Sequence, residues 1–375
     1  MVYEQKKHEQ KKWLIIYILW LIPLVFGSIW ILYFKLGGIT DGEILLSYLC
    51  WPFGSILALA ISSFFSFSRK ILMLLGILFA ALSFLVIPFL PNHFYTLAIS
   101  FFFYGLGVFF WVPFNTQYFS ISRESAATSG TVYFSLVGLL SIFLVVVGGI
   151  FFNNFGPQIF FLAAGFLYLL PAIFVLKTKD ERFRQDIIDC FNQARGFRTL
   201  NFIEGTTIGV AAAGTVISLI YLKTPIYLSI FIAFVSFFSI IASFVVSRLS
   251  DAIKKRKFYI TIFAAATGIF TSLMSFVGDL LGWAIASTLR NFFSNLFFPF
   301  TTAIILDNKQ DKQELAKVMT ARELFFNLGR IFGIGIALLS QFVLSDVRPA
   351  FFFLGIILLA YPLVVNIKRK TISVY

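Results

Sequence analysis

Twelve apolar runs, each about the length of a membrane-crossing helix, follow one another along the chain with polar segments between them. A helix rises about 1.5 Å per residue, so about 20 residues cross a hydrocarbon core about 30 Å thick. We therefore expect an all-α integral membrane protein with twelve transmembrane helices. The runs cover residues 13–34, 44–66, 71–90, 95–118, 127–152, 158–177, 200–222, 225–247, 258–278, 281–306, 318–343 and 348–366.

The composition agrees with this fold class. Of the 375 residues, 59% are hydrophobic and 13% are charged, and the mean hydropathy of +0.91 lies outside the range of soluble globular proteins. The 30 Lys and Arg residues form short clusters between apolar runs rather than one basic module, so no nucleic-acid partner is expected. Cys50 lies in an apolar run and Cys190 in a charged segment, so we expect no disulfide. His8 and His93 have no neighbouring metal ligands, and neither a metal nor a cofactor is expected.

Two interruptions organise the apolar runs. Residues 125–176 contain no charge, yet they exceed what one crossing can use, and residues 153–157 (N-N-F-G-P) form a turn cluster that predicts a break. Residues 178–199 are the longest polar interval and are mixed in charge. We expect them to form a cytoplasmic loop with a short surface helix, between an N-terminal six-helix half (residues 1–177) and a C-terminal six-helix half (residues 200–375).

Lys and Arg are distributed unevenly between alternate connections. The connections on the side of the N-terminus carry 24 of the 30, those on the opposite side carry 3, and the remaining 3 fall within helices. Because cytoplasmic loops carry the excess of Lys and Arg, both termini are predicted to be cytoplasmic. The expected location is the cell (inner) membrane, which the chain would cross many times.

The two halves resemble each other at a shift of 186 residues. Residues 110–116 (F-W-V-P-F-N-T) then lie over residues 296–302 (L-F-F-P-F-T-T), and the basic pair at 69–70 lies over that at 255–256. Six helices followed by six similar helices predict a parallel duplication about an axis along the membrane normal. Chance similarity between Phe-rich helices is the alternative.

Twelve spans in two halves, cytoplasmic termini and a long central loop resemble the major facilitator superfamily across essentially the whole chain. The local match is residues 247–256 (S-R-L-S-D-A-I-K-K-R), which are similar to that family's signature G-x-L-x-D-[RK]-x-G-R-[RK]. The acid and the basic pair of the signature are in place, whereas Ser247 and Lys254 replace its two glycines. The resemblance implies a transporter fold and does not identify a subfamily.

The resemblance also implies a cytoplasmic gate. In the family, the signature acid helps to latch the cytoplasmic face by meeting the start of a helix of the opposite half, which here would bring Asp251 near Arg123. The first-half copy has Phe65 where the acid would stand, so that side is expected to lack an acidic latch. A positive-inside loop without further role is the alternative. The expected gate residues are Asp251, Lys255, Arg256, Arg123 and Arg322.

Four polar residues fall within the eleventh apolar run. Glu323, Asn327 and Arg330 are spaced by four and three residues and so form one stripe on a helix, with Arg322 beside it. Charges in a bilayer are tolerated where they face a bundle interior or a watered cavity. Arg330 and Arg290 of the tenth run both come out near the membrane midplane. Two such cations favour an anionic or strongly polar solute, or a paired carboxylate, in one shared chamber.

These observations define the expected site. Glu323 is the candidate for coupling to a proton or another cation, with a structural ion pair as the alternative. Glu204 is only four residues into the seventh run, so we expect it at the membrane interface. The substrate-binding candidates are Arg330, Arg290, Asn327, Asn115, Asn291, Gln117 and Trp111.

The function expected is secondary active or facilitative transport of a small polar or anionic solute by alternating access. No G-x-x-x-x-G-K-[ST] loop occurs, which argues against an ATP-driven pump, and no catalytic triad or metal motif suggests an enzyme. Expected partners are the solute, a proton or cation, and membrane lipids, with the chain acting as a monomer. A flippase for a lipid or lipid-linked precursor and a non-transporting membrane sensor are the alternatives.

Overall fold

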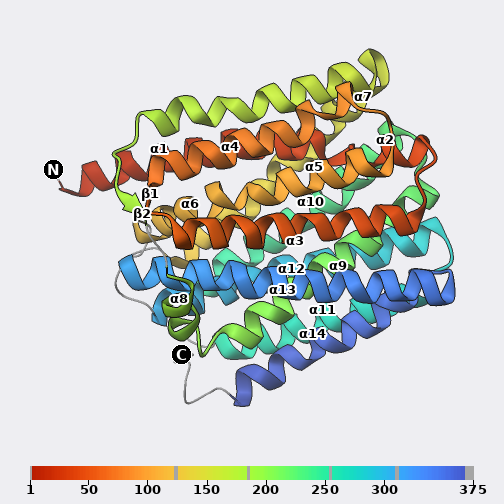
Figure 1. Cartoon of the computed structure of the whole chain (residues 1–375). Coiled ribbons are helices and arrows are strands. Elements are labelled where there is room, and N and C mark those ends of the chain that lie inside the picture. Colours follow the sequence, from red (N-terminus) through yellow and green to blue (C-terminus); the bar gives the residue numbers. More distant parts are fainter. Residues whose placement is uncertain (1, 122–125, 184–185, 253–255, 309–311, 368–375) are drawn as a thin grey trace.

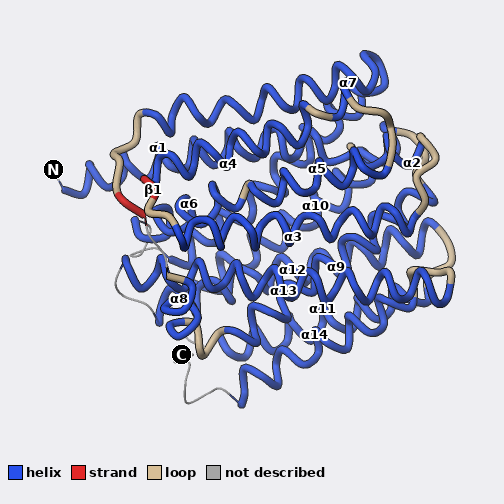
Figure 2. Tube along the Cα trace, in the orientation of Figure 1, coloured by secondary structure: helices blue, strands red, loops and turns tan. Residues whose placement is uncertain are grey.

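Long helices make up nearly all of the structure, as the apolar runs predict (Figure 1; Figure 2). The computed structural model describes residues 2–121, 126–183, 186–252, 256–308 and 312–367. A helix pairs its backbone N–H and C=O groups within its own segment, which a hydrocarbon phase requires because it offers no other partners. The helices lie roughly along one direction, and both the start of α1 and the end of α14 lie toward the same end of the bundle (Figure 1).

In the first half, Thr40 and Glu43 form a capping box that starts α3, and Gly107 separates α5 from α6 within one crossing. The elements are α1 (Val2–Phe26), η1 (Gly27–Ile29), α2 (Ile31–Leu36), α3 (Asp41–Phe64), β1 (Phe67–Ser68), α4 (Arg69–Leu85), η2 (Ile87–Phe89), α5 (Phe94–Leu106), α6 (Val108–Ile121) and α7 (Ala126–Leu176).

In the second half, a short central segment leads into helices that match the predicted runs closely. The elements are β2 (Arg182–Phe183), α8 (Ile187–Gln193), α9 (Arg198–Tyr221), α10 (Pro225–Ala252), α11 (Arg256–Leu273), η4 (Met274–Phe276), α12 (Leu280–Asn308), α13 (Lys312–Leu344) and α14 (Pro349–Ile367).

The break predicted at residues 153–157 lies inside α7. Gly156 has φ 79° and ψ 168°, outside the helical region, and Pro157 follows it. A positive φ favours glycine, which has no Cβ. Ten helices among the described residues are long and apolar enough to cross a membrane. Counting the two arms of α7 separately and adding α12 gives twelve crossings, so the predicted fold class is confirmed.

The same pattern of helix neighbours occurs in both halves. In the first, α1 packs on α7, α3 on α5, and α4 on both α5 and α7; in the second, α9 packs on α13, α10 on α12, and α11 on both α12 and α14. Gly148 in the first arm of α7 faces α1, and Gly165 in the second arm faces α4, so the pairs correspond in chain order. Between the halves, α10 packs along α7 and α13 along α3.

Glycines bring α9 and α13 into direct backbone contact. Gly205 and Gly209 on α9 face Gly329 and Gly333 on α13, and a Cβ atom built on Gly205 would overlap the carbonyl oxygen of Phe326. Both pairs have the G-x-x-x-G spacing that allows close helix approach. The contact therefore sets the distance between the charged side chains that these two helices carry.

The central segment contacts both halves. Its strand β2 pairs antiparallel with β1, and its helix α8 packs on α13. Arg69 is 4% exposed, and its guanidinium donates to Glu181 Oε2 at 2.8 Å and to Gln117 Oε1 at 2.6 Å. In the contact of α8 with α13, burial raises the pKa of the Cys190 thiol to about 12. The segment predicted as a loop with a short surface helix contains the short helix α8, and it also joins the two halves.

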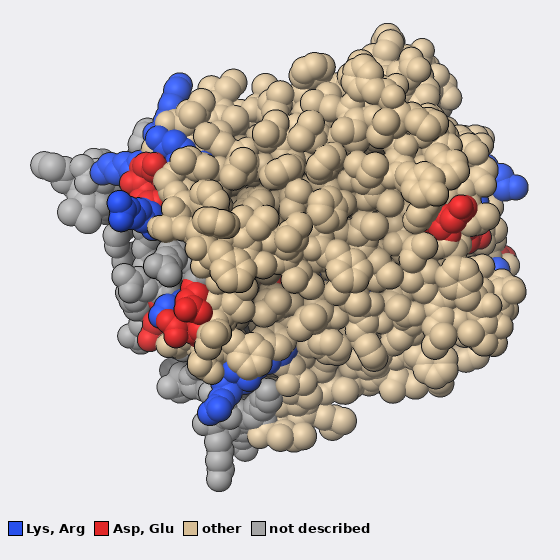
Figure 3. All heavy atoms as spheres, in the orientation of Figure 1, with Lys and Arg blue, Asp and Glu red and all other residues tan. Residues whose placement is uncertain are grey.

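Charged side chains gather at the two ends of the bundle. Figure 3 shows a broad, almost uncharged band across the middle of the visible face, with Lys, Arg, Asp and Glu near its two ends. We call the end at which α1 begins the basic end. Such a band is what a helical bundle presents to lipid.

Gly329→Leu is expected to destabilise the protein, because the added side chain would push α13 away from α9. Overpacking a well-packed core typically costs about 1–3 kcal/mol, so the midpoint of thermal unfolding in detergent should fall. Gly335→Ala on the same helix is the control, since no atom lies within 4 Å of a Cβ built there. Equal thermal stability of the two variants would contradict the close contact.

Candidate functional site

A cavity of about 200 Å³, here called the Arg330 cavity, lies between the two halves. Its walls come from α3, α5, α6 and α7 of the first half and from α13 of the second, on the side of the bundle nearer the basic end. Its polar lining residues are Ser55, Tyr104, Asn115, Tyr133, Arg322, Glu323 and Arg330, and its aromatic ones include Trp51, Trp111, Phe119, Phe134 and Phe326.

Arg330 reaches across the two halves. Its guanidinium carbon lies 4.3 Å from the ring centroid of Trp51 on α3 and 4.4 Å from that of Phe326 on α13, and Nη1 donates to Asn327 Oδ1 at 2.8 Å. Arg330 is 9% exposed, and its Nε has no hydrogen-bond partner among the described residues. Cation–π contacts stabilise a desolvated guanidinium by about 2 kcal/mol, but they leave its charge in place. An anion entering the cavity would meet a cation that is held but not neutralised by direct pairing.

Aromatic rings fix the opposite wall. The hydroxyl of Tyr133 donates to Asn115 Oδ1 at 3.0 Å, and the hydroxyl of Tyr17 donates to the carbonyl oxygen of Tyr133 at 3.0 Å. The Tyr17 and Tyr133 rings stack with centroids 4.4 Å apart, and Trp111 meets Tyr17 edge-on. The orientation of Asn115 is thus set by residues of three helices rather than by solvent.

Arg322 is partnered within the second half. Its Nη2 donates to Glu204 Oε2 at 3.4 Å, and the Tyr361 hydroxyl donates to Glu204 Oε1 at 3.3 Å. Glu204 is 1% exposed, so its side chain is packed inside the bundle. Its place beside Gly205, at the start of a G-x-x-x-G face that packs on α13, was the signal that could have shown this. The Arg322 contact with Glu204 joins α9 to α13, not one half to the other.

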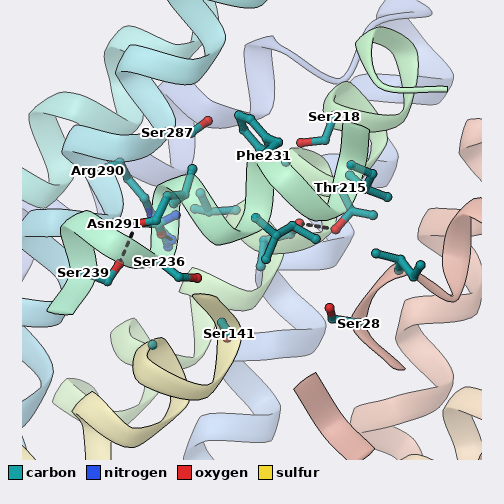
Figure 4. A pocket seen from close by; sticks show the side chains of 18 of the residues that line it. Ser28, Ser141, Thr215, Ser218, Phe231, Ser236, Ser239, Ser287, Arg290 and Asn291 are labelled. Atoms are coloured by element: carbon teal, nitrogen blue, oxygen red, sulfur yellow. Dashed lines mark hydrogen bonds between the residues drawn. The ribbon is translucent and has the colours of Figure 1, made fainter. Parts of the chain in front are cut away.

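A second cavity, of about 360 Å³, contains Arg290 and is here called the Arg290 cavity (Figure 4). It extends from the middle of the bundle toward the end opposite the basic end, and its walls come from η1, α2, α7, α9, α10, η4 and α12. Most of its wall is aliphatic or aromatic. Its polar lining residues are Ser28, Ser141, Thr215, Ser218, Ser236, Ser239, Ser287, Arg290, Asn291 and Asn295.

Arg290 has one close polar partner in the described structure. Its Nη1 donates to Asn291 Oδ1 at 2.7 Å, whereas its Nε and the nearby buried Ser287 hydroxyl have no hydrogen-bond partner among the described residues. The described residues that line this cavity include no Asp or Glu. In Figure 4, Arg290 and Asn291 lie on the opposite side of the cavity from Ser28 and Thr215.

The structure separates the two arginines that were expected to share one chamber. Arg330, Asn115, Trp111 and Glu323 line one cavity, while Arg290 and Asn291 line the other; only Phe134 is common to both linings as described. The physical reason is that Arg290 and Arg330 lie on helices α12 and α13, which are not packed as neighbours, and Phe134 of α7 lines both cavities.

Two other candidates lie outside the cavity linings. Asn327 is fully buried behind Arg330, and its amide also donates to the Glu323 carbonyl oxygen at 2.7 Å, so it positions the guanidinium. Gln117 lies toward the basic end and accepts from Arg69. The sequence did not predict this hydrogen bond, because the Arg69 contact depends on how α4 packs against α6.

Most of the expected gate cannot be placed. Arg123 and Lys255 lie outside the described residues, and so do the side chains of Asp251 and Arg256. No group of three or more His, Cys, Asp or Glu side chains comes together in the described part of the chain.

The sequence of the second half decides the family. The model of the Major Facilitator Superfamily matches residues 197–371, which span α9 to α14, and the fold of the whole chain is that of solved transporters of this superfamily. The second half of the chain therefore matches the Major Facilitator Superfamily by sequence, and the whole chain matches it by fold. The predicted resemblance is therefore confirmed, and the subfamily stays unidentified. A comparison with curated proteins finds no match.

Solved structures match this chain over nearly its whole length. The E. coli fucose:proton symporter FucP matches with a TM-score of 0.70 at 12% identity, over 97% of this chain and 99% of that one. The human organic anion transporter MFSD10 matches with a TM-score of 0.67 at 10% identity, over 96% and 99%. A POT family transporter in complex with a thioalcohol-conjugated peptide matches with a TM-score of 0.70 at 12% identity, over 98% and 97%.

At these identities the likeness establishes the fold and leaves the site to be argued from this chain's own residues. Family and fold together support membrane solute transport by a multi-pass membrane protein, and they point to a transporter rather than an enzyme.

Glu204→Gln is expected to destabilise the protein, because it removes the carboxylate that Arg322 contacts inside the bundle. Breaking a buried ion pair by removing one partner costs about 3–5 kcal/mol. The double variant Glu204→Gln with Arg322→Gln should be more stable than Glu204→Gln alone, as measured by a double-mutant cycle of thermal unfolding. Tyr361→Phe is the milder comparison, with an expected loss of about 1 kcal/mol. A double variant as unstable as the sum of the two single changes would exclude the pair.

Proposed function

We propose that this transporter moves a small anionic or strongly polar solute across the membrane by alternating access, as a secondary active or facilitative carrier. The observation that supports this most is the Arg330 guanidinium, which is buried between the halves and contacts Trp51 of the first and Phe326 of the second. A ligand shifts an equilibrium between conformations only if it binds them differently. A solute bound to Arg330 would bind the two conformations differently, because the residues around Arg330 come from both halves.

The size of the cavity favours a small solute. Pockets for drug-sized ligands measure about 300–1,000 Å³, and the Arg330 cavity of about 200 Å³ lies below that range. Its polar groups include the guanidinium fork of Arg330 and the amide of Asn115, which suit a carboxylate or a similar planar anion. This cavity gives no support to a lipid as its occupant, so the flippase alternative is not favoured.

We propose Glu323 as the coupling residue. It lines the same cavity as Arg330, two helical turns away on α13. With Glu323 ionised, the two side chains balance each other in charge; with Glu323 protonated, Arg330 is left as a net cation. A proton and an anion would then enter together, and neither would bind as well alone. FucP, a fucose:proton symporter, and MFSD10, an organic anion transporter, share this fold.

Transport would follow from the two halves, residues 1–177 and 200–375, rocking about the interfaces of α7 with α10 and of α3 with α13. The excess of Lys and Arg at the basic end supports a cytoplasmic location for this end and for both termini. With that orientation, the Arg330 cavity lies in the cytoplasmic part of the path and the Arg290 cavity in the outer part.

Arg330→Ala is expected to abolish uptake of the solute while leaving expression and detergent stability close to normal. The assay is uptake into proteoliposomes of a panel of radiolabelled small carboxylates, with a neutral sugar as comparison. Arg330→Lys keeps the charge but loses the planar fork and should retain partial uptake. Arg348→Ala, a change to a partly exposed arginine at the opposite end of the bundle, is the matched control. Normal uptake by Arg330→Ala would remove this residue from the site.

Glu323→Gln is expected to separate uptake from the pH gradient. In the native protein, an acidic exterior should accelerate uptake because protonation of Glu323 accompanies anion binding. The amide imitates the protonated acid, so uptake by the variant should be the same with and without the gradient. The control is Glu9→Gln, a change to an exposed acid. An undiminished response of the Glu323→Gln variant to the gradient would reject this coupling role.

A further inference from the structure

The Arg290 cavity differs from the Arg330 cavity in three ways that bear on what it binds. It is larger, about 360 Å³ against about 200 Å³. Its wall is mainly aliphatic, and its described lining contains no carboxylate, whereas Glu323 lines the other cavity. We propose that the Arg290 cavity is a second ligand site, which binds an amphipathic organic anion with its acid group on Arg290 and its apolar body along the aliphatic wall.

The head-group end is built from Arg290, Asn291 and Ser287. Arg290 gives one Nη1 hydrogen bond to Asn291 Oδ1 at 2.7 Å, while its Nε and the Ser287 hydroxyl have no partner in the described structure. A guanidinium binds a carboxylate through two parallel N–H donors. Buried charges are normally paired, and no described carboxylate pairs with this one. An acid group supplied by a ligand would satisfy the orphaned donors and balance the charge.

The rest of the cavity accepts an apolar body. Side chains such as Ile232, Val235 and Phe231 of α10 and Trp283 of α12 line it, and its volume falls within the range of about 300–1,000 Å³ for drug-sized ligands. Figure 4 shows Phe231 facing the space between Arg290 and Thr215. Serine hydroxyls are scattered along this wall, and those of Ser141 and Ser239 donate to carbonyl oxygens of their own helices. A small inorganic anion would fill only the Arg290 end.

The site rests on the proposed function only in that both cavities would belong to one transport path, divided at Phe134. Binding at Arg290 can be measured without any flux. A failure of this inference is therefore distinguishable from a failure of the transport proposal, which Arg330→Ala tests by uptake.

The experiment is equilibrium binding of radiolabelled octanoate to the full-length protein in a neutral detergent, with competition by unlabelled ligands. Octanoate is expected to bind saturably. Octanol, which has the same body without the charge, and acetate, which has the charge without the body, should compete at least about tenfold less well. Equal competition by octanol, or no saturable binding of octanoate, would overturn the inference.

Variants locate the bound anion. Arg290→Gln should weaken octanoate binding by about tenfold to a hundredfold, the effect of losing a hydrogen bond to a charged group. Ala211→Phe narrows the cavity from an exposed position on its wall and leaves Arg290 in place, so it should also weaken octanoate binding, and it serves if Arg290→Gln does not fold. Arg348→Gln is the control and should bind octanoate as the native chain does. Unchanged binding by Arg290→Gln, or loss in Arg330→Gln alone, would place the anion elsewhere and refute the site.

Discussion

The burial of guanidinium groups among apolar helices is the constraint on which the rest of this structure depends. A charge in a low-dielectric interior is costly unless it is paired, bonded or watered, and three arginines meet this requirement differently. Arg322 contacts the Glu204 carboxylate. Arg330 contacts two aromatic rings and donates to the amide of Asn327. Arg290 donates to the amide of Asn291 and lines a cavity. The fewer protein groups contact a guanidinium, the more of its donors are left for a ligand.

Helix packing sets the surroundings of these arginines. The glycine contacts between α9 and α13 bring Arg322 within reach of Glu204, and the packing of α13 on α3 places Trp51 over Arg330. Neither contact involves residues near each other in sequence. Cavities of different character therefore lie on either side of Phe134: one is small and lined by both Glu323 and Arg330, and the other is larger, mainly apolar and without a described acid. A transport path that is divided into two cavities in this way can bind its solute in one environment and release it from another.

Some of the site was predictable from local patterns. The i, i+4, i+7 spacing placed Glu323 and Arg330 on one face of a helix, and both line the same cavity. Asn327 shares that face but is used to hold Arg330. Position along a run was a poor guide to Glu204, because depth in a membrane says nothing about which neighbour a side chain faces. Gln117 failed as a cavity residue for the same reason, since Arg69 of another helix holds it.

The sequence by itself determined the class of the fold. The length of an apolar run is set by the thickness of the bilayer, and a break such as that at Gly156 is set by local backbone sterics, so both can be seen in one stretch of chain. Tertiary structure decided which polar residues meet. A cavity is the space left where helices distant in sequence fail to touch, and only their packing settles that Arg290 and Arg330 lie in different ones.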